Sequence, residues 1–147
     1  MSIPERWDKF SELPSDIKQR LAQLMPLFER EGVQLAYLFG SLGSGQEGHD
    51  VDLAILTRSE PAFRLRSAIT ECLGTERLDL VDLRRASPVL RFEILRTGQL
   101  LYAADQALSE RFEMATLQVY QDTAWLRRRQ RAYLRERMEL WSSGKKP

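Results

Sequence analysis

Apolar residues recur along the chain in two spacings, one typical of helices and the other of strands. From about Ser15 to Glu31 they fall three or four residues apart, which predicts a helix that stops at Gly32. Pro26 lies inside this segment and should kink or split the helix. The apolar stripe consists of Ile17, Leu21, Leu24, Met25 and Phe28. The first predicted element is therefore a bent or divided helix.

Short apolar runs bounded by turn-forming residues predict four strands. The first runs from Val33 to Phe39 and the second from Val51 to Leu56. Arg77 to Leu83 is the third, because its apolar run is too short for a helix, and Gln99 to Ala103 is a short last strand. The strands are therefore spread along the chain with room for helices between them.

Two helices are predicted between these strands. Ser59-Glu60-Pro61 begins one with a capping hydroxyl and a proline in the first turn, and Gly74 ends it. Its apolar face consists of Leu65, Ala68, Ile69, Cys72 and Leu73. Ser87-Pro88 begins the other, which Gly98 closes. Strands and helices thus alternate, which favours a mixed α and β domain.

The segment after Asp105 is predicted to be helical to about Trp141, so we divide the chain into a domain over 1–104 and a helical extension over 105–147. The extension holds nine basic and six acidic residues. Six of its arginines form a dense stretch: Arg127, Arg128, Arg129, Arg131, Arg135 and Arg137. The arginines alternate with Trp125, Tyr133 and Trp141, which suits an interface with an acidic partner. Equally, Trp125, Leu126, Tyr133 and Leu140 could pack onto the domain or a second copy while the arginines are solvated. An RNA-binding surface ranks behind both.

Composition excludes several classes of protein. At 147 residues with 43% hydrophobic content the chain can form one ordinary domain, and its net charge of +1 gives no general case for nucleic acid or a membrane surface. A single cysteine, Cys72, rules out an internal disulfide and fits a reducing compartment. We interpret it as a small core residue. The first residues lack a secretory signal and no run is long enough to span a bilayer, so we expect a cytoplasmic protein.

The turn between the first two strands carries the candidate chemistry. Gly40 and Ser41 close the first apolar run, and Asp50-Val51-Asp52 opens the next. Because side chains alternate along a strand, Asp50 and Asp52 should point to the same face. Neighbouring carboxylates repel each other, and proteins usually offset such repulsion with a cation. This pattern indicates a metal site.

The loop and a third carboxylate extend this interpretation. The stretch from Gly40 to Gly48 holds four glycines, and its amide hydrogens and the Ser41 hydroxyl can hold phosphate oxygens. It lacks the lysine of a P-loop. On the third strand Asp79 and Asp82 face opposite ways, so only one can join the cleft; Asp82, near the strand end, is suited to capping the next turn. Three carboxylates could bind one or two Mg²⁺ ions together with a triphosphate.

These residues resemble the minimal nucleotidyltransferases of the DNA polymerase beta superfamily, and the MNT antitoxin type in particular. The likeness rests on Gly40-Ser41, Asp50-Val51-Asp52 and Leu78-Asp79-Leu80-Val81, and it continues from Leu90 to Tyr102. It implies an α+β fold with a small mixed sheet flanked by helices. It also implies that Asp50 and Asp52 bind the metals, that Asp79 completes the site, and that Gly40 and Ser41 contact the nucleotide.

The resemblance further implies a function. Proteins of this type are antitoxins of type VII-like toxin–antitoxin pairs, which use Mg²⁺ and ATP to transfer AMP to a tyrosine of a HEPN ribonuclease toxin. The segment from Leu42 to His49 is shorter than is common in the family and lacks its usual arginine, and His49 is either a further metal contact or a solvent-facing turn residue. One rival is a non-catalytic antitoxin that acts by binding alone. Another is a small-molecule nucleotidyltransferase, for whose additional domain 147 residues leave little room.

Overall fold

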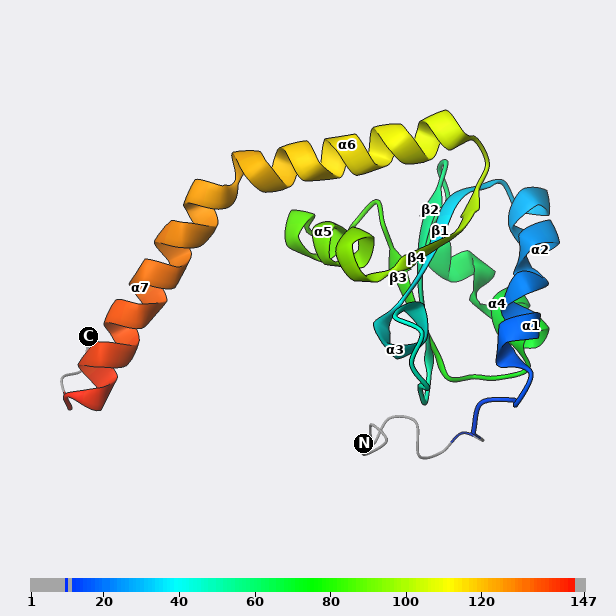
Figure 1. Cartoon of the computed structure of the whole chain (residues 1–147), viewed down its shortest axis with the longest axis horizontal. Coiled ribbons are helices and arrows are strands. Elements are labelled where there is room, and N and C mark those ends of the chain that lie inside the picture. Colours follow the sequence, from blue (N-terminus) through cyan, green and yellow to red (C-terminus); the bar gives the residue numbers. More distant parts are fainter. Residues whose placement is uncertain (1–9, 11, 145–147) are drawn as a thin grey trace.

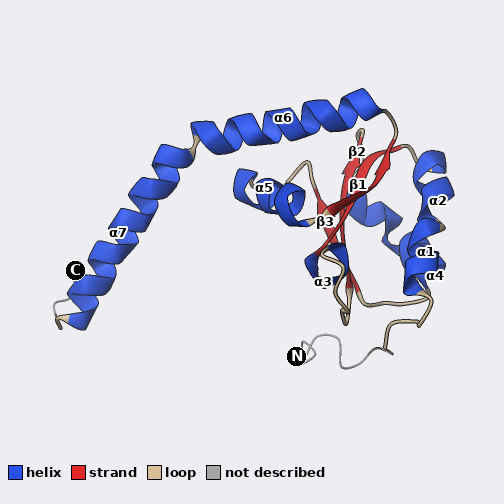
Figure 2. Ribbon diagram, viewed as in Figure 1, coloured by secondary structure: helices blue, strands red, loops and turns tan. Residues whose placement is uncertain are grey.

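A four-stranded sheet with helices on both faces forms the body of the molecule, and two long helices follow it (Figures 1 and 2). The computed structural model describes residues 10 and 12–144. The start of the chain, where no secretory signal is predicted, and the last three residues lie outside this range. In the part described, no helix is both long and apolar enough to cross a membrane.

The sheet is mixed, as the sequence predicts, and its order is β3-β2-β1-β4. The strands are β1 (Val33–Phe39), β2 (Val51–Thr57), β3 (Leu78–Asp82) and β4 (Gln99–Ala103). β1 pairs antiparallel with both β2 and β4, whereas β2 and β3 run parallel. Because β2 and β3 are parallel, their amino-terminal ends meet at the same edge of the sheet.

Three helices cover one face of the sheet: α1 (Ile17–Ala22), α2 (Leu24–Arg30) and α4 (Arg66–Leu73). The predicted first helix is split at Gln23, between α1 and α2. Pro26 explains the split, because it has no N–H to donate to the carbonyl of Ala22. The core here includes Leu24, Phe28, Val51, Leu53, Ile55, Ile69 and Leu73. Cys72 is partly buried against this core, as expected of a small packing residue.

The segment that enters α4 differs from the prediction. The expected cap at Ser59 is wrong, because the chain bends over residues 58–60, Pro61 is extended, and a 3₁₀ turn (Ala62–Leu65) then precedes α4. The amide of Ala62 donates instead to Asp82 Oδ2 at 3.4 Å. At the other end α4 stops at Gly74, which has a φ of 70°, as predicted. A carboxylate from a distant strand thus replaces the local hydroxyl at the start of this segment.

The opposite face of the sheet is covered by α5 (Pro88–Thr97) and α6 (Gln106–Asp122). Ser87 caps α5 as predicted, its hydroxyl accepting from the amide of Leu90 at 3.2 Å. This second core consists of Leu35, Tyr37, Ala54, Leu83 and Ile94, with α6 packed against it through Leu108 and Phe112. The Tyr37 hydroxyl donates to Glu113 Oε1 of α6 at 3.3 Å. Burial, aided by the negative charge of Glu113, raises the pKa of Tyr37.

The predicted C-terminal helix is divided at Thr123 into α6 and α7 (Ala124–Ser142). Phe92 of α5 stacks on Tyr120 with ring centroids 3.8 Å apart, and the Arg127 guanidinium lies 3.6 Å from the same ring. Two groups this close to one ring must occupy its opposite faces. Beyond this stack α7 extends away from the sheet (Figure 1). None of the α7 residues is buried, and Tyr133 is 56% exposed.

Candidate active site

Strand pairing brings the three predicted aspartates together at one edge of the sheet. Asp52 lies beside Asp79 in the parallel pair of β2 and β3, and Asp50 precedes Asp52 by two residues on the same face. Between them Val51 is fully buried against the helices of the other face. The alternation expected from the sequence therefore holds, with apolar side chains on one side and carboxylates on the other.

One carboxylate oxygen from each of Asp50, Asp52 and Asp79 lies within 4.8 Å of the other two. All three residues are partly exposed. Within residues 10 and 12–144, this is the group of acidic, histidine or cysteine side chains that is close enough to share an ion, and neither His49 nor Asp82 belongs to it. Hard oxygen donors gathered in this way suit Mg²⁺, and binding a cation would relieve the repulsion between them.

Asp82, the alternative acid of β3, binds backbone amides and lies outside the carboxylate group. Its Oδ1 accepts from the amide of Arg84 at 3.0 Å, and its Oδ2 accepts from the amide of Ala62. Its carbonyl accepts from the amides of Arg85 and Ala86, both at 3.1 Å. Asp82 thus caps the turn after β3, on the opposite side of the strand from Asp79.

Gly40 lets the backbone pass directly over the Asp52 carboxylate. Its φ is 68°, and a Cβ built on it would overlap Asp52 Oδ2. The sequence predicts a turn here, and the structure forms a single helical turn, α3 (Gly40–Gly43), directly after β1. Only glycine meets both requirements, because other residues are disfavoured at this φ and carry a Cβ.

Ser41 follows Gly40 at the start of α3. Its carbonyl accepts from the amide of Gln46 at 2.9 Å and from the Ser44 hydroxyl at 3.0 Å, which closes the loop on itself. That Gly40 and Ser41 contact a nucleotide phosphate stays a prediction.

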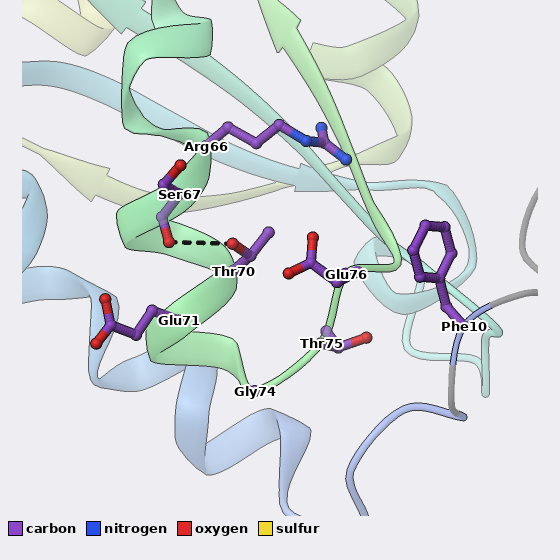
Figure 3. Close-up of a pocket in the computed structure, with 8 residues that line it drawn as sticks. All are labelled: Phe10, Arg66, Ser67, Thr70, Glu71, Gly74, Thr75 and Glu76. Atoms are coloured by element: carbon purple, nitrogen blue, oxygen red, sulfur yellow. Dashed lines mark hydrogen bonds between the residues drawn. The ribbon is translucent and has the colours of Figure 1, made fainter.

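A separate cavity of about 690 Å³ lies between α4 and the loop that follows it (Figure 3). Among its lining residues are Phe10, Thr70 and Glu76, but none of the three aspartates, Gly40 or Ser41. The cavity is therefore distinct from the carboxylate site. Its wall includes Arg66, which extends from α4 towards β3 (Figure 3).

Two arginines that the sequence did not single out support the site. Arg66 Nη2 donates to the carbonyl of Leu78 at 2.8 Å, and Arg77 Nη1 donates to the carbonyl of His49 at 3.2 Å. Each carbonyl belongs to the residue just before one of the aspartates. Sequence patterns could not reveal these contacts, because the partners are 12 and 28 positions apart and the acceptors are backbone atoms.

Comparison with known families decides the classification. The sequence profile of the polymerase beta nucleotidyltransferases matches residues 22–107, which is more than half of the chain. The chain belongs to this family. The match confirms the predicted nucleotidyltransferase fold and covers every residue of the carboxylate site.

Individual members of the polymerase beta family agree with this assignment. The protein adenylyltransferase MntA of Shewanella oneidensis is 36% identical over 99 residues, which cover 60% of this chain and 67% of MntA. A solved structure of a tri-AMPylated Shewanella oneidensis HEPN toxin with its MNT antitoxin matches with a TM-score of 0.62 and 27% identity, over 83% of this chain and 98% of the other.

A second solved structure, of a toxin–antitoxin with AMP-PNP, matches with a TM-score of 0.62 and 28% identity. It covers 81% of this nucleotidyltransferase and 98% of the matched chain. The two structures match 83% and 81% of this chain, which is more than residues 1–107 alone could supply. The structural likeness therefore extends into the C-terminal helices. The family assignment predicted from the aspartates and Gly40-Ser41 is therefore confirmed.

Proposed function

We propose that this nucleotidyltransferase is the antitoxin of a toxin–antitoxin pair and transfers AMP from ATP to a tyrosine of a HEPN ribonuclease toxin. The observation that carries the proposal is the gathering of Asp50, Asp52 and Asp79 beside Gly40 and Ser41. The 36% sequence identity to MntA, a protein adenylyltransferase, supports the type of reaction. The likeness to an MNT antitoxin in complex with a tri-AMPylated HEPN toxin supports the acceptor.

In this proposal the tyrosine oxygen attacks the α-phosphorus of ATP. A bond forms between these two atoms, the bond from the α-phosphorus to the bridging oxygen breaks, pyrophosphate leaves, and the hydroxyl proton is released to solvent. Asp50, Asp52 and Asp79 would hold Mg²⁺, which neutralises charge on the phosphates and makes the attacking hydroxyl more acidic. Asp79 helps to activate the acceptor hydroxyl, and Gly40 and Ser41 hold the triphosphate. No other cofactor is required.

The test uses the full chain purified with the toxin from the neighbouring reading frame, together with Mg²⁺ and ATP labelled at the α-phosphate. We expect label on the toxin with the natural chain and none with Asp52→Asn. Asp52→Asn should fold normally, because it removes one of three repelling charges. Asp122→Asn, which changes an exposed acid at the end of α6, is the matched control and should transfer AMP normally.

Two results would contradict this proposal. A stable, unlabelled complex that still suppresses the toxin would identify a non-catalytic antitoxin, a rival favoured by the absence of lysine and arginine from Leu42 to His49. Label transfer by Asp52→Asn at the natural rate would place the chemistry elsewhere.

We also propose that α7 is the docking surface for the toxin, since the domain leaves this helix uncovered. One face of α7 presents exposed Leu134, Met138 and Trp141, which are 57%, 70% and 63% exposed. The helix carries six arginines and two glutamates, so pairing it with α7 of a second copy would bring like charges together. An apolar groove with an acidic rim on the toxin would complement both features.

Replacing Leu134 and Met138 together with serine should release the toxin from the complex and leave the melting temperature of the antitoxin unchanged. Val89→Ser is the matched control, because Val89 is an exposed apolar residue on α5, away from α7. Co-purification and light scattering measure the outcome. Retained toxin, or a mass change of the isolated antitoxin from dimer to monomer, would instead assign α7 to another interface.

A further inference from the structure

The backbone around the three aspartates is not equally constrained. Asp52 lies inside the sheet, with Phe39 of β1 on one side and Asp79 of β3 on the other. Asp50 precedes β2 and therefore lies outside the strand. Asp79 lies on β3, which is an edge strand with a pairing partner on one side. Strand pairing alone therefore constrains the backbone of Asp50 and Asp79 less than that of Asp52.

Arg66 supplies that support beside Asp79. The carbonyl of Arg77 faces β2, because it accepts from the amide of Val51 at 2.8 Å. Successive carbonyls of a strand point in opposite directions, so the next one, of Leu78, points to the open edge. Arg66 Nη2 reaches it at 2.8 Å. The carbonyl of the peptide that joins Leu78 to Asp79 is therefore held by Arg66 at the open edge.

Arg77 supplies the corresponding support beside Asp50. Its guanidinium donates to the carbonyl of His49 at 3.2 Å and to the carbonyl of Phe10 at 2.9 Å. The residue is only 3% exposed. A buried guanidinium that binds backbone carbonyls is costly to retain for charge alone. Its contacts instead fix the peptide that joins His49 to Asp50.

We propose that Arg66 and Arg77 are positioning residues, which hold Asp79 and Asp50 in place for metal binding. This inference rests on the proposed function. Each guanidinium fixes the peptide plane before one aspartate, and so fixes the direction in which its side chain leaves the backbone.

The experiment measures binding of Mn²⁺ to the full chain by electron paramagnetic resonance, with Asp52→Asn to define loss of the site. Arg66→Met and Arg77→Lys should each raise the Mn²⁺ dissociation constant about tenfold, as is usual when groups that orient metal ligands are removed. Arg66→Lys should restore part of the affinity, because its ammonium can replace the single contact to Leu78, whereas Arg77 makes two contacts to separate carbonyls. Arg64→Met is the matched control, because Arg64 is exposed and pairs with Glu60. Its affinity should stay within about twofold of the natural chain.

Kinetics of AMP transfer provide a second measurement. In the Arg66 variants the half-saturating Mg²⁺ concentration should rise by about the same factor, and the rate at saturating Mg²⁺ should be nearly restored. Natural Mn²⁺ affinity in Arg66→Met would overturn the inference. So would an equal loss in Arg64→Met, which would indicate a general effect of positive charge.

The variants also separate this inference from the proposed function. If Arg77→Lys fails to fold, Arg66→Met decides the matter, because Arg66 is only partly buried. If the natural chain binds Mn²⁺ through Asp52 but transfers no AMP, the proposed reaction fails while the role of the two arginines stands.

Discussion

Replacing Gly40 with alanine tests the geometry of the site most directly. Gly40 and Gly32 have nearly the same φ, 68° and 70°, so alanine carries the same backbone penalty at either position. That penalty is about 1–2 kcal/mol for a residue held in the left-handed region. For a chain of this size it should lower the melting temperature by about 2–8 °C in each variant.

The two variants should differ in activity, because their surroundings differ. A Cβ at Gly32 meets no atom within 4 Å, whereas a Cβ at Gly40 overlaps the Asp52 carboxylate. Moving a metal ligand by about 1 Å can reduce the rate about 100-fold. We therefore expect Gly40→Ala to lose about 100-fold in Mg²⁺-dependent AMP transfer to the toxin, and Gly32→Ala to keep the natural rate. Equal rates of AMP transfer in the two variants, measured at a temperature where both are folded, would refute the reasoning.

Three further changes test other parts of the structure. Tyr37→Phe removes a phenol whose pKa is raised by burial and by Glu113. Since the folded state favours the neutral phenol, the free energy of unfolding should fall as pH rises above about 10, and urea unfolding should show less of this decline in the variant. Asp82→Ala should cost about 1–2 kcal/mol in thermal unfolding but keep AMP transfer, unlike Asp79→Ala, and equal losses would contradict our assignment. Ser87→Ala should cost about 1 kcal/mol through its lost cap, and an unchanged melting temperature would contradict that role.

Much of the sheet is predictable from local sequence. The bounds predicted for β1 and β4 agree with the structure, because their apolar runs end at glycine or at polar turn residues. The common face of Asp50 and Asp52 follows from strand periodicity alone. The start of the segment that leads into α4 was missed because the amide of Ala62, the first residue of the 3₁₀ turn, is bound by Asp82, which lies 20 positions away. Local capping rules cannot identify such a partner.

The division of the C-terminal helix was also beyond the sequence pattern. Apolar spacing continues through Thr123 without a proline or glycine, and so predicts a single helix. The bend lies next to the stack of Phe92, Tyr120 and Arg127, which joins α5, α6 and the first turn of α7. These contacts depend on how α6 lies across α5. Helix periodicity carries no information about such packing.

The pairing of Asp52 with Asp79 also protects the chain against misfolding. If β3 slipped by one residue along β2, each of its side chains would turn to the opposite face. The Asp79 side chain would then enter the hydrophobic core that now contains Leu78, where an isolated negative charge is strongly disfavoured. An acid proposed to serve catalysis thereby penalises wrong pairing of an edge strand while the protein is still being assembled.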